Sequence, residues 1–130
     1  MAFRLLGGFM NIAVVGSHDW TNYSTVMRTL TVAVEDWKHH YPDDRVINFV
    51  HTGYRGAESM VVEYVGKVEG LLKQKGYKIN EYRIKSKDLI DLVNSDITWS
   101  IVFKKNPCKR CDLFVKLSTE KLIPTQVEEE

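Results

Sequence analysis

The run from Asn11 to Gly16 constrains the fold most, because it reads Asn-Ile-Ala-Val-Val-Gly without alternation of polar and apolar side chains. A strand with one face in water alternates, whereas a strand covered on both faces is apolar nearly throughout. We therefore expect this run to be a central strand of a parallel sheet.

The rest of the chain repeats an alternation of strand and helix patterns. Apolar side chains at three- and four-residue steps over residues 23–37 predict a helix that ends near residues 39–42, and those over residues 57–72 predict a second helix closed by Gly76. Residues 45–50 predict the strand between them. Further strands are expected at residues 77–82, 97–103 and 122–127, and further helices at 86–94 and 112–119. This alternation predicts a three-layer α/β fold with a mostly parallel five-stranded sheet and helices on both faces.

Three aromatic side chains and two glycines give expectations about packing. Trp37 lies on the apolar stripe of the first helix, and Trp99 and Phe103 fall in the fourth strand, so all three are expected in the core. Gly66 and Gly70 fall inside the second helix, where each costs about 1 kcal/mol relative to alanine. We expect close packing against the sheet or a partner helix to explain them.

The length and composition suit one ordinary domain, with 130 residues of which 44% are hydrophobic. Such a chain buries roughly two thirds of its unfolded surface, so it needs neither metal nor disulfide to hold a core. We expect a single domain over residues 11–127, an N-terminal extension over residues 1–10 and an acidic tail over residues 128–130. No apolar run approaches the roughly 20 residues of a membrane span and no export cleavage site is evident, so we expect a cytoplasmic protein without membrane contact.

The net charge of +1 conceals a basic segment. Residues 67–110 hold 11 Lys and Arg against 5 Asp and Glu. A duplex-binding domain usually carries a strongly basic face overall, so small anions are the favoured partners.

The loops that follow the strands are the expected place for a ligand, because in open parallel sheets they meet helix N-termini with unpaired N–H groups. The first loop begins at Gly16 and continues as Ser17-His18-Asp19-Trp20. It offers a hydroxyl, an imidazole, a carboxylate and an aromatic ring. A tight turn with a helix cap and a core tryptophan explains the same residues equally well.

The second loop, His51 to Glu58, is the most informative segment. Gly53 and Gly56 allow the backbone to approach a ligand, and Arg55 supplies a planar cation for phosphate or carboxylate. Glu58 is either a charge that compensates the helix dipole or a carboxylate that binds ribose hydroxyls or acts as a general base. The segment matches neither the Walker A pattern nor the Gly-x-Gly-x-x-Gly fingerprint.

The third loop, Lys104 to Cys111, is rich in cations and is either another wall of the same anion site or a solvated basic loop. Its Cys108-x-x-Cys111 pair supplies only half of a zinc tetrahedron, so no metal is expected. A thioredoxin-like redox pair is disfavoured because the pair follows a late strand rather than the first. We expect two buried or idle thiols.

Two blocks of the sequence carry a family resemblance: Val14-Val15-Gly16-Ser17 with Asp19-Trp20, and His51-x-Gly53-x-Arg55-Gly56-Ala57-Glu58. They resemble the SLOG superfamily of Rossmann-like proteins, in the branch of short bacterial and phage proteins related to YspA and YpsA. The resemblance implies a Rossmann-like fold and a site for a nucleotide or nucleotide sugar. His18 stands where that branch has arginine and Thr52 where it has glycine, and the Pro-Gly-Gly-x-Gly-Thr-x-x-Glu motif of the phosphoribohydrolases is absent. These departures favour binding over bond cleavage.

The residues and the resemblance together predict that the chain binds a nucleoside phosphate or ADP-ribose-like ligand without a further cofactor. The expected ligand-binding residues are Gly16, Ser17, His18, Trp20, Thr52, Gly53, Arg55, Gly56, Lys109 and Arg110, and Glu58 is the candidate catalytic residue. One alternative is a nucleotide N-glycosidase, in which Glu58 assists attack by water. Another is a phage-type interaction protein that binds a host protein, nucleic acid or signalling nucleotide. A homodimer that pairs through helices is also expected.

Overall fold

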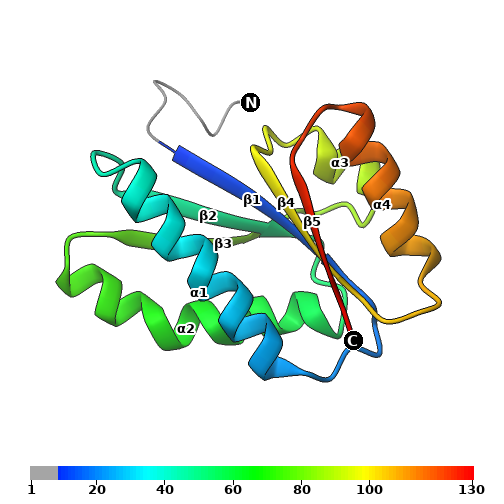
Figure 1. Ribbon diagram of the computed structural model, residues 1–130, viewed down its shortest axis with the longest axis horizontal. Helices are drawn as coiled ribbons and strands as arrows, with labels where there is room; N and C mark the ends of the chain where they lie inside the picture. Colours follow the sequence, from blue (N-terminus) through cyan, green and yellow to red (C-terminus); the bar gives the residue numbers. More distant parts are fainter. Residues whose placement is uncertain (1–8) are drawn as a thin grey trace.

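The apolar run at residues 11–16 forms the middle of the sheet, as predicted. The computed structural model describes residues 9–130 (Figure 1). The strands are β1 (Phe9–Gly16), β2 (Val46–His51), β3 (Lys78–Arg83), β4 (Trp99–Lys104) and β5 (Thr125–Glu129), and the helices are α1 (Tyr23–His40), α2 (Ala57–Gln74), α3 (Leu89–Val93) and α4 (Lys109–Glu120). All pairings in the sheet are parallel and the strand order is β3-β2-β1-β4-β5. The three-layer α/β prediction is confirmed.

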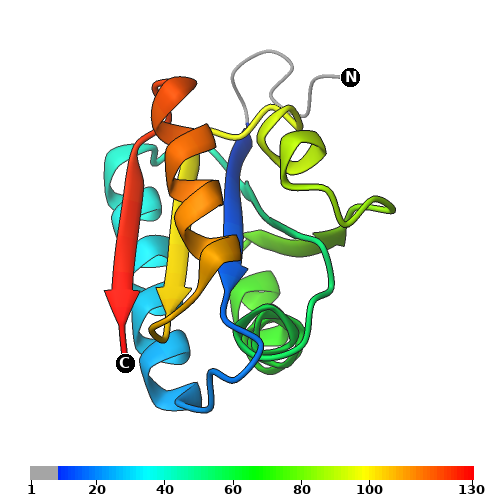
Figure 2. The same ribbon diagram turned by 90° about the vertical axis from the view of Figure 1, so that its right-hand side faces the viewer.

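Alternate residues of β1 face two separate cores, which explains why its sequence shows no polar alternation. Ile12 and Val14 pack in the core beneath α1 and α2. Ala13 and Val15 pack in the core beneath α3 and α4. Figure 2 shows the two helical layers on opposite faces of the sheet.

A row of side-chain amides, two buried and one half-buried, joins the first three strands. Asn11, Asn48 and Asn80 occupy matching register positions on β1, β2 and β3. Asn48 Nδ2 donates to Asn11 Oδ1, and Asn80 Nδ2 donates to Asn48 Oδ1, each at 2.9 Å. Asn11 Nδ2 completes the row by donating to the carbonyl oxygen of Asp96 at 3.1 Å. Because buried polar groups need partners, the row favours one alignment of these strands.

The packing predictions for Trp37 and Phe103 hold and that for Trp99 is wrong, whereas for Gly66 and Gly70 packing against the sheet is wrong and packing against a partner helix stays a prediction. Trp37 and Phe103 are buried as expected, but Trp99 is 38% exposed. Trp99 pairs in register with Ile12 on the α1 face, where a groove separates the helix from β4 and β5. Close packing within the chain does not explain Gly66 and Gly70, because a Cβ at either position would meet no described atom within 4 Å.

Several element boundaries also differ from the expected ones. Asp88 caps α3 through its side chain, so that helix is shorter than predicted, and Cys108 caps α4, which begins earlier than predicted. Residues 128–129 of the expected acidic tail belong to the edge strand β5. Met10 of the expected extension belongs to β1, and residues 1–8 of that extension lie outside the described residues.

Candidate functional site

The loops that follow β1, β2 and β4 meet at the carboxyl edge of the sheet (Figure 2). The strand order brings them together, since β1 lies between β2 and β4 and the crossovers diverge at that point. A cavity of about 200 Å³ lies there, which we call the edge hollow. It is lined by Gly16, Ser17, His18, Asp19, Tyr54, Pro107, Cys108, Lys109 and Arg110.

A buried carboxylate ties the three loops together beside the edge hollow. Glu58, in the first turn of α2, is 0% exposed. Its Oε1 accepts hydrogen bonds from the backbone N–H and the hydroxyl of Thr52 at 2.9 and 2.8 Å. Its Oε2 accepts from the Gly16 N–H at 3.4 Å and from Arg110 Nη1 at 2.5 Å. One side chain thus connects residues from all three loops.

Arg110 is held by further contacts beyond its ion pair. Its Nη2 donates to the Thr52 hydroxyl oxygen at 2.6 Å. The guanidinium carbon lies 4.2 Å from the centre of the Tyr54 ring, a cation–π distance. The His18 ring meets the same tyrosine edge-on at 6.4 Å. These contacts fix the guanidinium in the wall of the hollow. Because Glu58 already neutralises part of its charge, it would attract an anion less strongly than a free arginine.

The surroundings of Glu58 bear on its candidate catalytic role. A general base needs a lone pair within reach of the proton it removes, directly or through one water. Both oxygens of Glu58 already accept hydrogen bonds from the chain, and the residue has no exposed surface. A role as base would require the pair with Arg110 to open. The contacts that Glu58 makes suit a structural role in which it links the three loops.

Two of the predicted glycines are required by close contacts within the chain itself. A Cβ on Gly56, whose φ is +91°, would lie 2.2 Å from the carbonyl oxygen of Ser17. A Cβ on Gly16 would lie 2.4 Å from the Cβ of Ala57. The start of α2 thus packs directly against the loop after β1, and larger side chains would push the two apart.

His51 fixes the beginning of the second loop and has no free nitrogen. Its Nδ1 accepts from the Gly53 N–H at 2.9 Å, so its Nε2 carries the proton and donates to Glu81 Oε2 at 2.5 Å. The residue is 1% exposed. This buried imidazole positions the turn at Gly53 rather than offering a base to a ligand.

Half of the residues predicted to bind a ligand line the hollow. These are Gly16, Ser17, His18, Lys109 and Arg110. Trp20, Thr52, Gly53, Arg55 and Gly56 do not line it. Trp20 is 2% exposed, packs on Phe103 and donates from Nε1 to the Asn22 carbonyl at 2.9 Å, so it is a core residue.

Three more of the five that do not line the hollow belong to the second loop. Thr52 is 0% exposed, and a Cβ on Gly53 would overlap the side chain of Arg83. Arg55 is exposed and follows Tyr54, which lines the hollow. Tyr54 was not among the predicted site residues. Its place between a glycine and an arginine in this loop is the sequence feature that could have indicated it.

The cations of the third loop are mostly paired. Lys104 Nζ lies 2.7 Å from Asp112 Oδ1, and the hydrogen bond that Lys104 donates to this carboxylate raises the pKa of Lys104. Lys105 contacts Glu130 at 3.4 Å. Lys109 is exposed and makes no ion pair within residues 9–130. The exposed carboxylate of Asp19 also lines the hollow and carries the opposite charge.

Cys108 and Cys111 differ from expectation. The structure joins them as a disulfide, so the interpretation as two idle thiols is wrong. The bond lies at the start of α4, and Cys108 also lines the edge hollow.

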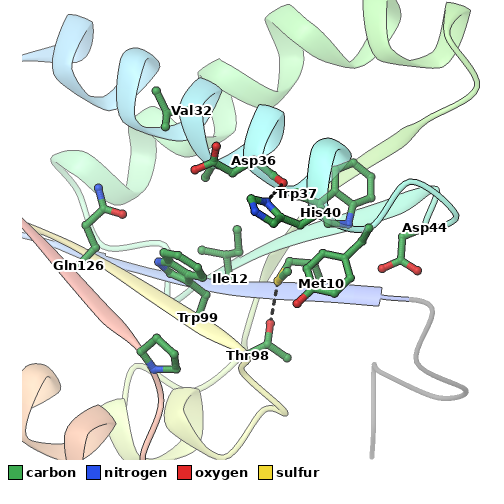
Figure 3. A pocket seen from close by; sticks show the side chains of 13 residues that line it. Met10, Ile12, Val32, Asp36, Trp37, His40, Asp44, Thr98, Trp99 and Gln126 are labelled. Carbon is green, nitrogen blue, oxygen red and sulfur yellow. Dashed lines mark hydrogen bonds between the residues drawn. The ribbon is translucent and has the colours of Figure 1, made fainter.

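A larger cavity of about 600 Å³ lies between α1 and the strands β1, β4 and β5, and we call it the α1 groove (Figure 3). Its apolar lining includes Met10, Ile12, Val32 and Trp99, and Asp36 and Asp44 also line it. Figure 3 shows Trp99 facing the side chains of α1 across this space. None of the predicted ligand-binding residues belongs to it.

Within the part of the chain that the structure describes, no group of three or more His, Cys, Asp or Glu side chains could hold a metal ion. No helix in that part is long and apolar enough to cross a membrane. No family model, curated protein or solved structure matches the chain.

Proposed function

We propose that the chain binds a nucleotide-derived ligand, a nucleoside phosphate or an ADP-ribose-like molecule, at the carboxyl edge of its parallel sheet. The observation that carries the proposal is the convergence of three loops on one hollow whose lining includes Lys109, a cation without an ion pair within residues 9–130. The exposed Arg55, which follows the lining residue Tyr54 in the sequence, is a second cation without an ion pair in that range. The N-termini of α2 and α4 begin at the same edge and add partial positive charge. A phosphate group is the favoured occupant.

The size of the hollow suggests how such a ligand would bind. A volume of about 200 Å³ is below the range of roughly 300–1,000 Å³ typical of pockets for whole small molecules. We expect the phosphate inside the hollow and the sugar and base outside it, along Tyr54 and His18. The buried Glu58–Arg110 pair would hold the loops in place, and the proposal assigns it no bond cleavage.

Calorimetric titration with AMP, NAD and ADP-ribose tests this proposal. We expect at least one of them to bind, and Lys109→Gln to weaken binding about tenfold, which corresponds to about 1.4 kcal/mol. Arg55→Ala should also weaken it. Lys116→Gln is the matched control, since Lys116 is exposed on the same helix and does not line the hollow. The absence of heat with all three ligands, or equal affinities for Lys109→Gln and wild type, would overturn the proposal.

The proposed ligand class agrees with what the SLOG resemblance implies, and membership of that superfamily and of its phage branch stays a prediction. A cytoplasmic location belongs to the same proposal. Self-association through the exposed helix face at Gly66 and Gly70 also stays a prediction, and the open space above both glycines leaves room for a partner helix. Light scattering of the purified protein measures it.

Protein binding is a second candidate function, and the α1 groove favours it. Trp99 and Val32 are 38% and 53% exposed there, and Asp36 and Asp44 lie beside them. A partner segment with an apolar side chain next to a cation would complement both features. A photo-crosslinking residue at position 99 should capture such a partner, and the same residue at Val62, exposed on α2, should not. Equal capture at both positions would argue against the groove.

A further inference from the structure

We propose that Cys108 and Cys111 form a thiol–disulfide exchange site whose substrates are low-molecular-weight disulfides. In this proposal Cys108 is the attacking sulfur and Cys111 is the resolving sulfur. The two residues flank the first turn of α4 with their Cα atoms 5.3 Å apart, and the structure contains their bonded, oxidised form. The proposal does not depend on nucleotide binding, although both use the edge hollow.

The two sulfurs differ in how a substrate can reach them. Cys108 is half-buried and lines the hollow, so a small molecule can approach it from solvent. Cys111 is 0% exposed, and its Sγ lies 3.5 Å from the Ser17 hydroxyl oxygen and 3.9 Å from the Phe103 carbonyl oxygen. A resolving cysteine needs to reach only its partner. This difference in burial assigns the two roles.

The charges around Cys108 favour a thiolate on it. Its Sγ caps α4 by accepting the Cys111 backbone N–H at 3.1 Å, at the positive end of the helix dipole. The next residue, Lys109, is unpaired within the described chain. Around the hollow, the charge of Arg110 is offset by its pair with Glu58, and the exposed carboxylate of Asp19 opposes negative charge on the sulfur. Helix and lysine together stabilise negative charge on the sulfur.

The exchange balances without any further reactant. In the reduced protein, the Cys108 thiolate attacks one sulfur of R–S–S–R, the S–S bond breaks, and the first R–S⁻ leaves and takes a proton from water. Cys111 then loses its proton to solvent and attacks the Cys108 sulfur, which expels the second R–S⁻. The protein dithiol is oxidised by two electrons, and the substrate disulfide is reduced to two thiols. The Ser17 hydroxyl lies where it can donate to the Cys111 sulfur as charge develops there.

Single cysteine variants of the full chain test the assignment. Each protein is reduced with dithiothreitol, desalted and mixed with glutathione disulfide, and mass spectrometry follows the products. We expect Cys111→Ser to accumulate one glutathione on Cys108, and Cys108→Ser to react slower by on the order of tenfold because its remaining thiol is buried. Wild type should release two glutathione thiols and regain its internal bond.

Two results would overturn the proposal. The first is equal reaction rates for the two variants, with far-ultraviolet circular dichroism confirming that both are folded. The second is a wild-type bond that stays intact in millimolar reduced glutathione and opens only with dithiothreitol, because that behaviour marks a structural disulfide. Lys109→Gln in the Cys111→Ser background should slow the first step, whereas Lys116→Gln should not.

Discussion

The edge hollow and the α1 groove are built in opposite ways. The hollow is small, is made largely of loops and is lined mostly by residues with polar or charged side chains, and a buried ion pair with direct backbone contacts holds it. The groove is three times larger, mostly apolar, and made largely of side chains from α1 and the sheet. Loops carry few packing contacts of their own, so a few residues decide whether the hollow exists, whereas the groove persists as long as the sheet and α1 do.

The largest effect that separates the two regions is expected from Glu58→Gln. This substitution removes the buried negative charge that pairs with the Arg110 guanidinium. It also places an amide N–H₂ group, itself a donor, against N–H or O–H donors, so the free energy of unfolding should fall by about 3–5 kcal/mol. Urea denaturation measures the change. The double variant Glu58→Gln/Arg110→Gln should recover part of the loss. A loss below about 1 kcal/mol would mean that the hollow does not depend on this pair.

Gly56→Ala should have the next largest effect. Its Cβ would collide with the Ser17 carbonyl oxygen at a backbone angle that other residues rarely adopt, so we expect a loss of about 2–3 kcal/mol. Gly66→Ala in the same helix is the control and should gain up to about 1 kcal/mol, because space is open there. Similar losses for both variants would show that the loss in Gly56→Ala does not come from the contact with Ser17.

Substitutions in the groove should cost less. Trp99→Ala is expected to lower the free energy of unfolding by less than about 1.5 kcal/mol, because 38% of its surface is already exposed. Trp37→Ala, 2% exposed in the same wall, should cost about 3–5 kcal/mol. Thermal unfolding of the two variants compares them. Equal losses would mean that Trp99 is as well packed as a core residue.

The smallest expected effect is a pH dependence at the contact between α1 and α2, whose two hydrogen-bonded residues line neither cavity. Burial raises the pKa of Tyr64 above its ordinary value of 10.0, although a hydrogen bond with Thr31 opposes this. The unfolded chain therefore loses this proton at a lower pH than the folded chain. Stability should decrease as the pH rises above 10.0 through the folded-state pKa, and Tyr64→Phe should reduce that decrease. Urea denaturation at pH 9 and pH 11 measures it.

The sheet and the meeting of the three loops could be predicted because they follow from local patterns. The apolar run at residues 11–16 indicates a strand covered on both faces, and parallel topology then brings the loops to one edge. The Glu58–Arg110 pair could not be predicted in this way, since its members lie 52 residues apart and each looks like an ordinary charge at a helix start. The prediction that Trp99 lies in the core was wrong because the sequence around it does not reveal that α1 leaves part of β4 uncovered.

The amides of Asn11, Asn48 and Asn80 restrict the sheet in a way that an all-aliphatic interior would not. A shift of one residue between neighbouring strands would turn these amides to opposite faces and leave their donors unsatisfied among hydrocarbon. Aliphatic side chains at these positions would tolerate such misalignment far better. The alignment of β1 with β2, and with it the position of the loops that follow them, is therefore set near the opposite ends of these strands, by amides that line neither cavity.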